Sequence, residues 1–173
     1  MFVQPSIPTM KRQADLNCGW YCTKAMLAYW FERLSSRTHD SIPLQKTTVL
    51  GYHPKFDNVE IFKNDLRSAD KPTGQGAPMQ WERWLRIFGP VMVSGKLGAA
   101  DWGRIGNVRF GVGHWVLIVG IDIASGTISY KDPLQGDALK TKSFAHVDAR
   151  IEGKVYWLDQ AGATKVLCRL NAH

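Results

Sequence analysis

The feature that most constrains this chain is a loop that turns into a helix at a cysteine. The segment from Gln13 to Cys22 leads directly into apolar residues at helical spacing, which predicts a helix from about Cys18 to Leu34. Its buried face would carry Met26, Leu27, Trp30 and Leu34. Unpaired N–H groups and the helix dipole in the first turn favour a thiolate at Cys18. Two interpretations stay open on this segment alone: a nucleophilic Cys18, or a small buried cysteine.

A second constraint is a histidine at the start of an apolar segment that is long enough to form a β-strand. His114 begins an apolar run that is closed by Gly120 and Asp122, and residues 127–131 form a second strand-like run that ends at Asp132. With residues 123–126 as the turn, the two runs predict a hairpin in which His114 and Asp132 are neighbours. A carboxylate that accepts one imidazole N–H fixes the tautomer and orientation of the ring, and leaves the other nitrogen to face a thiol.

The order Cys, His, Asp, with a glutamine ahead of the cysteine, resembles the papain-like cysteine peptidases. Within them it is similar to the branch of the bacteriocin leader-processing peptidase domains and the papain-fold domains of bacterial effectors and toxins. The matching motifs are Cys18-Gly19 at the helix start, Gly113-His114-Trp115, and Asp132-Pro133 followed by Gly136. The resemblance implies one α+β domain over residues 1–173, in which an N-terminal helix bearing the nucleophile packs against an antiparallel β-sheet.

The same resemblance assigns roles to four residues. Cys18 is expected to be the nucleophile, His114 the base, Asp132 the group that orients the base, and Gln13 an oxyanion donor beside the Cys18 backbone N–H. Gln13 departs from the family pattern, because it lies five residues before the cysteine where about six is usual. We expect peptide-bond hydrolysis through a thioester. Two alternatives remain: another acyl transfer (deamidase, transglutaminase or peptidoglycan amidase), and a catalytically silent peptide-binding module.

Composition and cysteine spacing agree with a single soluble domain that needs no cofactor. At 173 residues and 45% hydrophobic content, the chain can bury a substantial core without disulfides or a metal ion. Three cysteines cannot all pair with one another, and their spacing predicts neither a disulfide framework nor a metal site. Residues 1–10 contain no apolar h-region, so we expect no signal peptide and no membrane anchor. A reducing cytoplasm is therefore expected, reached by a non-Sec route if the protein is delivered into a target cell.

The net charge of +7 indicates an acidic partner surface more than a nucleic acid. The basic residues are scattered, and no nucleic-acid-binding motif accompanies them. We therefore expect a protein or peptide substrate, and neither nucleic acid nor membrane as a partner. A small, basic, stand-alone domain of this kind resembles a delivered bacterial effector or toxin, for which an immunity or inhibitor protein is a further expected partner and the monomer the expected state.

The other segments carry less specific signals. Pro78 to Phe88 predicts a helix ended by Gly89-Pro90, with a core stripe of Trp81, Trp84, Leu85 and Phe88. Strands are expected at Val91–Gly95, Lys154–Leu158 and Ala163–Leu170, with Cys168 alternating inside the last as a structural residue. Residues 140–149 are ambiguous. The papain-like resemblance implies that the poorly periodic region 35–77 supplies much of the substrate cleft. His39 and His53 in this region are expected on the surface, and the glycine-rich loop 99–113 is expected to wall one side of the cleft.

Overall fold

The computed structural model describes residues 2–3, 10–12, 17–35, 42, 44, 59–97 and 114–172. Its helices are α1 (Cys18–Ser35), α3 (Val59–Phe62), α4 (Ala77–Phe88), the 3-10 helix η2 (Pro133–Gln135), α6 (Phe144–Asp148) and α7 (Gln160–Ala172). Its strands are β1 (Phe2–Val3), β2 (Arg67–Asp70), β3 (Val91–Gly95), β4 (His114–Asp122), β5 (Thr127–Lys131), β6 (Leu139–Ser143) and β7 (Ile151–Trp157). The α4 helix, the β3 strand and the β4–β5 hairpin agree closely with the sequence predictions.

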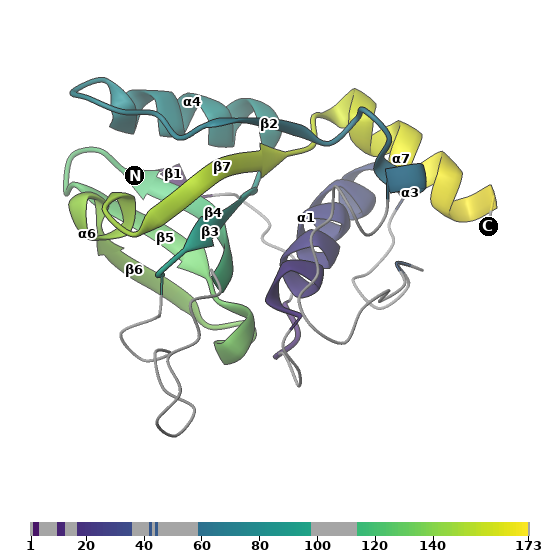
Figure 1. Ribbon diagram of the computed structural model, residues 1–173, viewed down its shortest axis with the longest axis horizontal. Helices are drawn as coiled ribbons and strands as arrows, with labels where there is room; N and C mark the ends of the chain where they lie inside the picture. The colour runs from purple at the N-terminus through teal and green to yellow at the C-terminus, as the bar shows by residue number, and fades with distance from the viewer. Residues whose placement is uncertain are drawn as a thin grey trace.

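The strands form one antiparallel sheet in the order β2-β7-β3-β4-β5-β6, with β1 paired to β4 (Figure 1). The β4–β5 pair is the predicted hairpin, and its turn occupies residues 123–126. Gly126 closes this turn with a φ of 64°, a conformation that glycine adopts without steric cost. The hairpin therefore returns the end of β5 to the start of β4.

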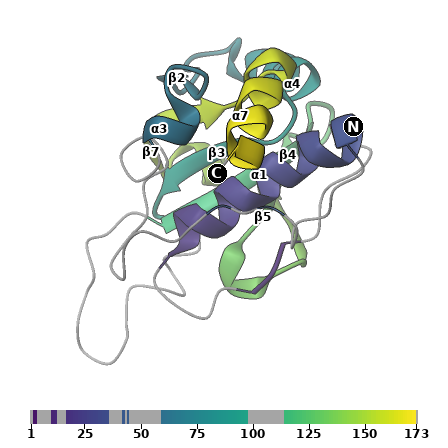
Figure 2. The same cartoon turned by 90° about the vertical axis from the view of Figure 1, so that its right-hand side faces the viewer.

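Alternate residues of the central strands enter two separate cores. Met92, Leu117 and Val119 join the core that also contains residues of α1 and α7. Val91, Val93, Val116 and Ile118 join the core that contains the buried face of α4. Because neighbouring side chains of a strand point to opposite faces, α1 with α7 covers one face of the sheet and α4 covers the other (Figures 1 and 2). An α+β arrangement with the Cys18 helix packed on an antiparallel sheet is thus observed.

The α1 helix is buried on almost every side, and not only along the predicted stripe. Every residue from Tyr21 to Phe31 is buried, and the helix contacts β3 and β4 of the sheet as well as α7, which lies beside it (Figure 2). Its few buried polar groups have partners: the Thr23 hydroxyl donates to the Gly19 carbonyl at 2.8 Å, and the Trp30 indole donates to the Leu158 carbonyl at 3.1 Å. A helix enclosed in this way gives the residues at its start a fixed position.

The α4 helix has the ends that the sequence predicts. A proline lies in its first turn, and Gly89 ends it at a φ of 72°. A Cβ at Gly89 would lie 2.2 Å from the Tyr29 ring, so this position requires glycine for space as well as for conformation. Of the predicted stripe, Trp81 and Leu85 are buried, while Trp84 and Phe88 are half-buried and pack on Trp157.

The predicted strand at Ala163–Leu170 is wrong, because this segment lies in helix α7. Its buried residues are Gly162, Ala163, Val166, Leu167 and Leu170, a spacing of three and four that belongs to a helix. The Asp159 carboxylate accepts the Gly162 N–H at 2.7 Å and so caps the first turn. Cys168 therefore does not alternate in a strand; it is exposed on α7.

The remaining predictions divide into those the structure answers and those it does not reach. Of the segment 140–149, ambiguous in sequence, residues 140–148 fall in β6 and α6 and Ala149 follows α6. The described part of region 35–77 contains α3 and β2. The predictions for Gln13, His39, His53 and the loop 99–113 fall outside the described residues. Across the described ranges, no helix has the length and apolar character needed to span a bilayer.

Candidate active site

Cys18 is the first residue of α1, and its surroundings differ sharply from those of Cys22. The Asn17 carbonyl accepts the N–H groups of Trp20 at 3.0 Å and Tyr21 at 3.3 Å, which starts the helix directly ahead of Cys18. Cys18 is partly exposed, whereas Cys22, one turn further on, is completely buried. Burial, with added contributions from Cys18 and Asp132, raises the pKa of the Cys22 thiol well above its ordinary value. Only the first of the two cysteines is open to a substrate.

The β4–β5 hairpin brings His114 and Asp132 together. His114 is the first residue of β4, and Asp132 follows the last residue of β5. Leu117 of β4 pairs with Lys131 of β5, so the start of one strand lies beside the end of the other. His114 Nε2 lies 2.7 Å from Asp132 Oδ1, and the two side chains are only 4% and 1% exposed. His114 and Asp132 are therefore neighbours in the structure, as the predicted hairpin requires.

Cys18 lies on the other side of His114. Its Sγ accepts the Trp115 backbone N–H at 3.4 Å, and its side chain is a hydrogen-bond partner of the His114 ring. Burial alone would lower the pKa of His114, but hydrogen bonds with Asp132 and Cys18, together with their negative charges, raise it to about 9. The imidazole is therefore cationic at neutral pH, between a sulfur and a carboxylate.

Asp132 is held by more than the histidine. Burial would raise its pKa, but the hydrogen bond and charge of His114, the Leu134 N–H and the charge of Lys140 hold the pKa below its ordinary value. Oδ1 accepts the Leu134 N–H at 3.1 Å as well as the imidazole, and this caps η2. Oδ2 lies 3.2 Å from Lys140 Nζ. Asp132 is therefore an ionised carboxylate with both oxygens occupied.

The turn after Asp132 also anchors the segment that leads to Gln13. Arg12 Nε donates to the Leu134 carbonyl at 3.0 Å, and the Met10 N–H donates to Asp137 Oδ1 at 3.1 Å. Gly136, at a φ of 64°, lies close to the backbone of Arg12, because an added Cβ would be 3.1 Å from the Arg12 backbone nitrogen. Residues 10–12 are thus packed against the turn that carries Asp132, directly before Gln13 in the chain.

Sequence reasoning missed the second partner of Asp132. In the sequence, Lys140 is one of several scattered basic residues and lies in the ambiguous segment 140–149. It meets Asp132 because β6 pairs with β5, with Lys140 opposite Tyr130. An alternating segment after Asp132-Pro133 was the available signal, since it would have indicated a third strand returning beside β5.

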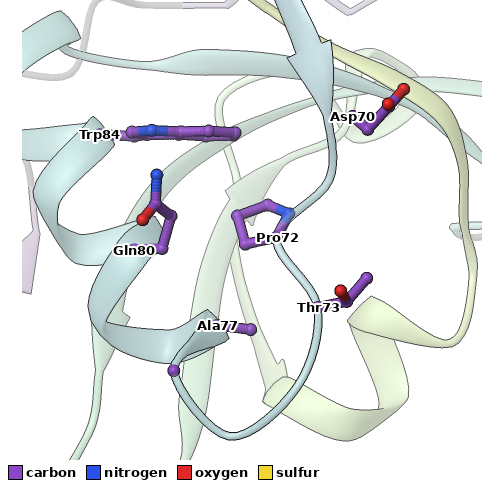
Figure 3. A pocket seen from close by; sticks show the side chains of 7 residues that line it. Asp70, Pro72, Thr73, Ala77, Gln80 and Trp84 are labelled. Atoms are coloured by element: carbon purple, nitrogen blue, oxygen red, sulfur yellow. The ribbon is translucent and has the colours of Figure 1, made fainter.

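Two other features of the described residues lie outside this cluster. A pocket of about 350 Å³ adjoins the start of α4, and its lining consists of Asp70, Pro72, Thr73, Gly76, Ala77, Gln80 and Trp84 (Figure 3). None of the residues around Cys18 contributes to it. Within the described ranges, no group of three or more histidine, cysteine or acidic side chains is arranged to hold a metal ion.

Comparison with known proteins identifies the family and the fold of the chain. The sequence matches the family described as papain-like cysteine protease AvrRpt2 over residues 2–149. The fold is similar to the crystal structure of the peptidase domain of Streptococcus ComA, a bifunctional ABC transporter involved in a quorum-sensing pathway, with a TM-score of 0.50 and 13% identity over 87% of this chain and 97% of that chain. A search of curated proteins finds no match. The α+β papain-like fold is thereby confirmed, and the chain belongs to the family of papain-like cysteine proteases represented by AvrRpt2 and is a cysteine peptidase.

Proposed function

We propose that this peptidase hydrolyses peptide bonds of a protein substrate through a triad of Cys18, His114 and Asp132. The observation that carries the proposal is the line of contacts from the Cys18 sulfur through the His114 ring to the buried Asp132 carboxylate. His114 bonds to Asp132 through Nε2, which leaves Nδ1 to exchange a proton with Cys18.

The chemistry then follows from the charges of the three groups. His114, with a pKa of about 9, holds a proton at neutral pH, and the proposed mechanism starts from this imidazolium paired with Cys18 as its thiolate. The thiolate attacks the substrate carbonyl, and the imidazolium gives its proton to the leaving amine as the thioester forms. His114 next takes a proton from water as the water oxygen attacks the thioester. The bond from carbon to the Cys18 sulfur then breaks, which releases the acid product and restores the thiolate and the imidazolium. Asp132 keeps the ring in one tautomer throughout.

The oxyanion that forms at the carbonyl needs N–H donors near the sulfur. Cys18 supplies one, because a residue at the start of a helix has a backbone N–H with no intrahelical acceptor. We propose Gln13 as the second donor. The support is indirect: residues 10–12 are fixed to the turn after Asp132, which limits how far the following residue can lie from the triad.

The biological setting proposed here rests on resemblance to bacterial effector and toxin domains. All three cysteines are free thiols, as suits a reducing cytoplasm, and we propose that the protein acts there as a monomer after delivery into a target cell. An immunity or inhibitor protein that covers the cleft is the expected partner in a producing cell.

The test is to compare the new protein N-termini in a cell extract treated with wild-type protein and with Cys18→Ala. A peptidase should generate termini that share residues on either side of the cut and that are missing with Cys18→Ala. If the two extracts have the same termini, peptide-bond hydrolysis at Cys18 is wrong. In that case, mass shifts of glutamine side chains in the same extracts would identify deamidation or transglutamination by the same three residues.

A further inference from the structure

Asp132 is shared between two cations. His114 from β4 occupies Oδ1 at 2.7 Å, and Lys140 from β6 occupies Oδ2 at 3.2 Å. The Asp132 side chain is only 1% exposed and that of Lys140 is 17% exposed, so this contact is largely removed from water. A charge-assisted hydrogen bond in such a place holds both groups in a defined geometry, and loss of one partner would leave the other charge largely buried and unpaired.

The contact restricts the carboxylate as a whole. Oδ1 is fixed by the imidazole and by the Leu134 N–H, and Lys140 is the donor to Oδ2 within the described residues. Without Lys140, a buried oxygen would lose its charged donor, and the carboxylate could rotate toward water or toward other donors. Lys140 therefore helps to keep Oδ1 directed at His114.

The contact also brings a second positive charge to the Asp132 carboxylate, in addition to the imidazolium of His114. The titratable groups around it come from α1 (Cys18, Cys22), β4 (His114), β5 (Lys131), β6 (Lys140) and the turn after η2 (Asp137). Arg12 contacts the same turn. Lys131 forms its ion pair with Asp137, so its charge is balanced locally. Lys140 has its ion pair with Asp132, and its charge therefore opposes the imidazolium of His114 across the same carboxylate.

We propose that Lys140 is a positioning residue of this site, which orients Asp132 and limits how tightly His114 holds its proton. The inference rests on the proposed triad and adds one residue to it. A general acid works best when its proton is neither lost too early nor held too firmly at the working pH. With Asp132 alone, His114 would hold its proton too firmly. The positive charge of Lys140 counteracts this effect.

The test is the pH dependence of Cys18 alkylation by iodoacetate, measured without substrate from pH 5 to 10. Iodoacetate is an anion that the imidazolium attracts, so its rate falls when His114 loses its proton. Lys140→Gln removes the charge and keeps an N–H donor. The alkaline limb of the profile is the pH range in which the alkylation rate falls. In Lys140→Gln, the midpoint of this limb should move upward by roughly one pH unit, as expected when a unit charge beyond the carboxylate is removed from a partly solvated site. Lys140→Arg should restore the wild-type limb.

A matched control lies two residues along the same strand. Lys142 on β6 is exposed, and Lys142→Gln should leave the limb where it is in the wild type. If Lys140 has only a structural role, Lys140→Gln would lower activity equally at every pH with an unmoved limb. An unmoved limb, or one that moves down, overturns the proposal.

Turnover of a peptide substrate distinguishes the two proposed effects of Lys140, its orientation of Asp132 and its positive charge. Lys140→Met, which has no donor, should lower kcat more than Lys140→Gln does, with KM unchanged, because Asp132 does not touch the substrate. Equal kcat in the two variants would contradict the orienting role. Failure of the triad itself gives a different result: Cys18→Ala would keep its activity, or wild-type Cys18 would react no faster than the exposed Cys168.

Discussion

Replacing Asp132 by asparagine should lower the pH at which His114 loses its proton. The substitution removes one negative charge and preserves the shape of the side chain. The His114 N–H and the Leu134 N–H both donate to Oδ1, so an asparagine is expected to keep its oxygen there. The asparagine amide NH2 then faces the Lys140 ammonium group. Because both groups are hydrogen-bond donors, they cannot bond to each other, and the lysine side chain should turn toward solvent.

The size of the effect follows from the pKa of His114. That pKa is about 9, against an ordinary value of 6.5, and Asp132 and Cys18 share the increase between them. An opposite charge in direct contact shifts a pKa by about 1–3 units. We therefore expect Asp132→Asn to lower the pKa by about 1–2 units, or roughly 1.4–2.7 kcal/mol of imidazolium stabilisation, and to bring the alkaline limb to about pH 7–8.

The assay is the same iodoacetate profile, with the modified cysteine located by peptide mass mapping. Asp122→Asn is the matched control, since it removes a carboxylate at the opposite end of β4 from His114 and should leave the limb near pH 9. If Asp132→Asn and wild type share one alkaline limb within error, Asp132 does not stabilise the imidazolium, and the account of the triad fails.

Four further substitutions test neighbouring parts of the site. Cys18→Ala should abolish peptidase turnover with the melting temperature unchanged, whereas Cys22→Ala should keep much of the turnover; the reverse result would exchange their roles. Gly136→Ala should lower the free energy of unfolding by about 1–3 kcal/mol in urea titrations, because the position has a φ of 64° and a Cβ would press on Arg12; an unchanged stability would contradict the close contact. Gln13→Ala should reduce kcat by roughly 10²–10³-fold and leave Cys18 alkylation intact, and near-normal turnover would show that another donor completes the oxyanion site.

The parts of the site that the sequence predicts are those set by local structure. A helix that begins at Cys18 and a hairpin with a four-residue turn are both encoded within short segments, by helical spacing in one case and by an apolar run with a closing glycine in the other. Once the hairpin is accepted, the proximity of His114 and Asp132 follows from the geometry of antiparallel strands.

The features that were missed depend on contacts between distant segments. Residues 163–170 fit both a strand and a helix by spacing, and the helix is fixed by the Asp159 cap and by the ion pair of Arg169 with Asp65 at 2.6 Å. Lys140 reaches Asp132 through the register of β6 on β5. The alternating segment after Asp132-Pro133 can indicate a strand there, but not its register. Asp159 ahead of residues 160–170 was the signal available in sequence for a helix start.

The central claim is that His114 activates Cys18, and the rate of Cys18 alkylation by iodoacetate at pH 6 tests it most directly. Cys168, exposed on α7, provides an ordinary thiol in the same molecule, so the ratio of the two modification rates needs no external reference. We expect Cys18 to react much faster than Cys168 in the wild type, and His114→Ala to remove that advantage while Cys168 reacts as before. Equal rates for the two cysteines in the wild type, or a Cys18 rate that His114→Ala leaves unchanged, would contradict the claim.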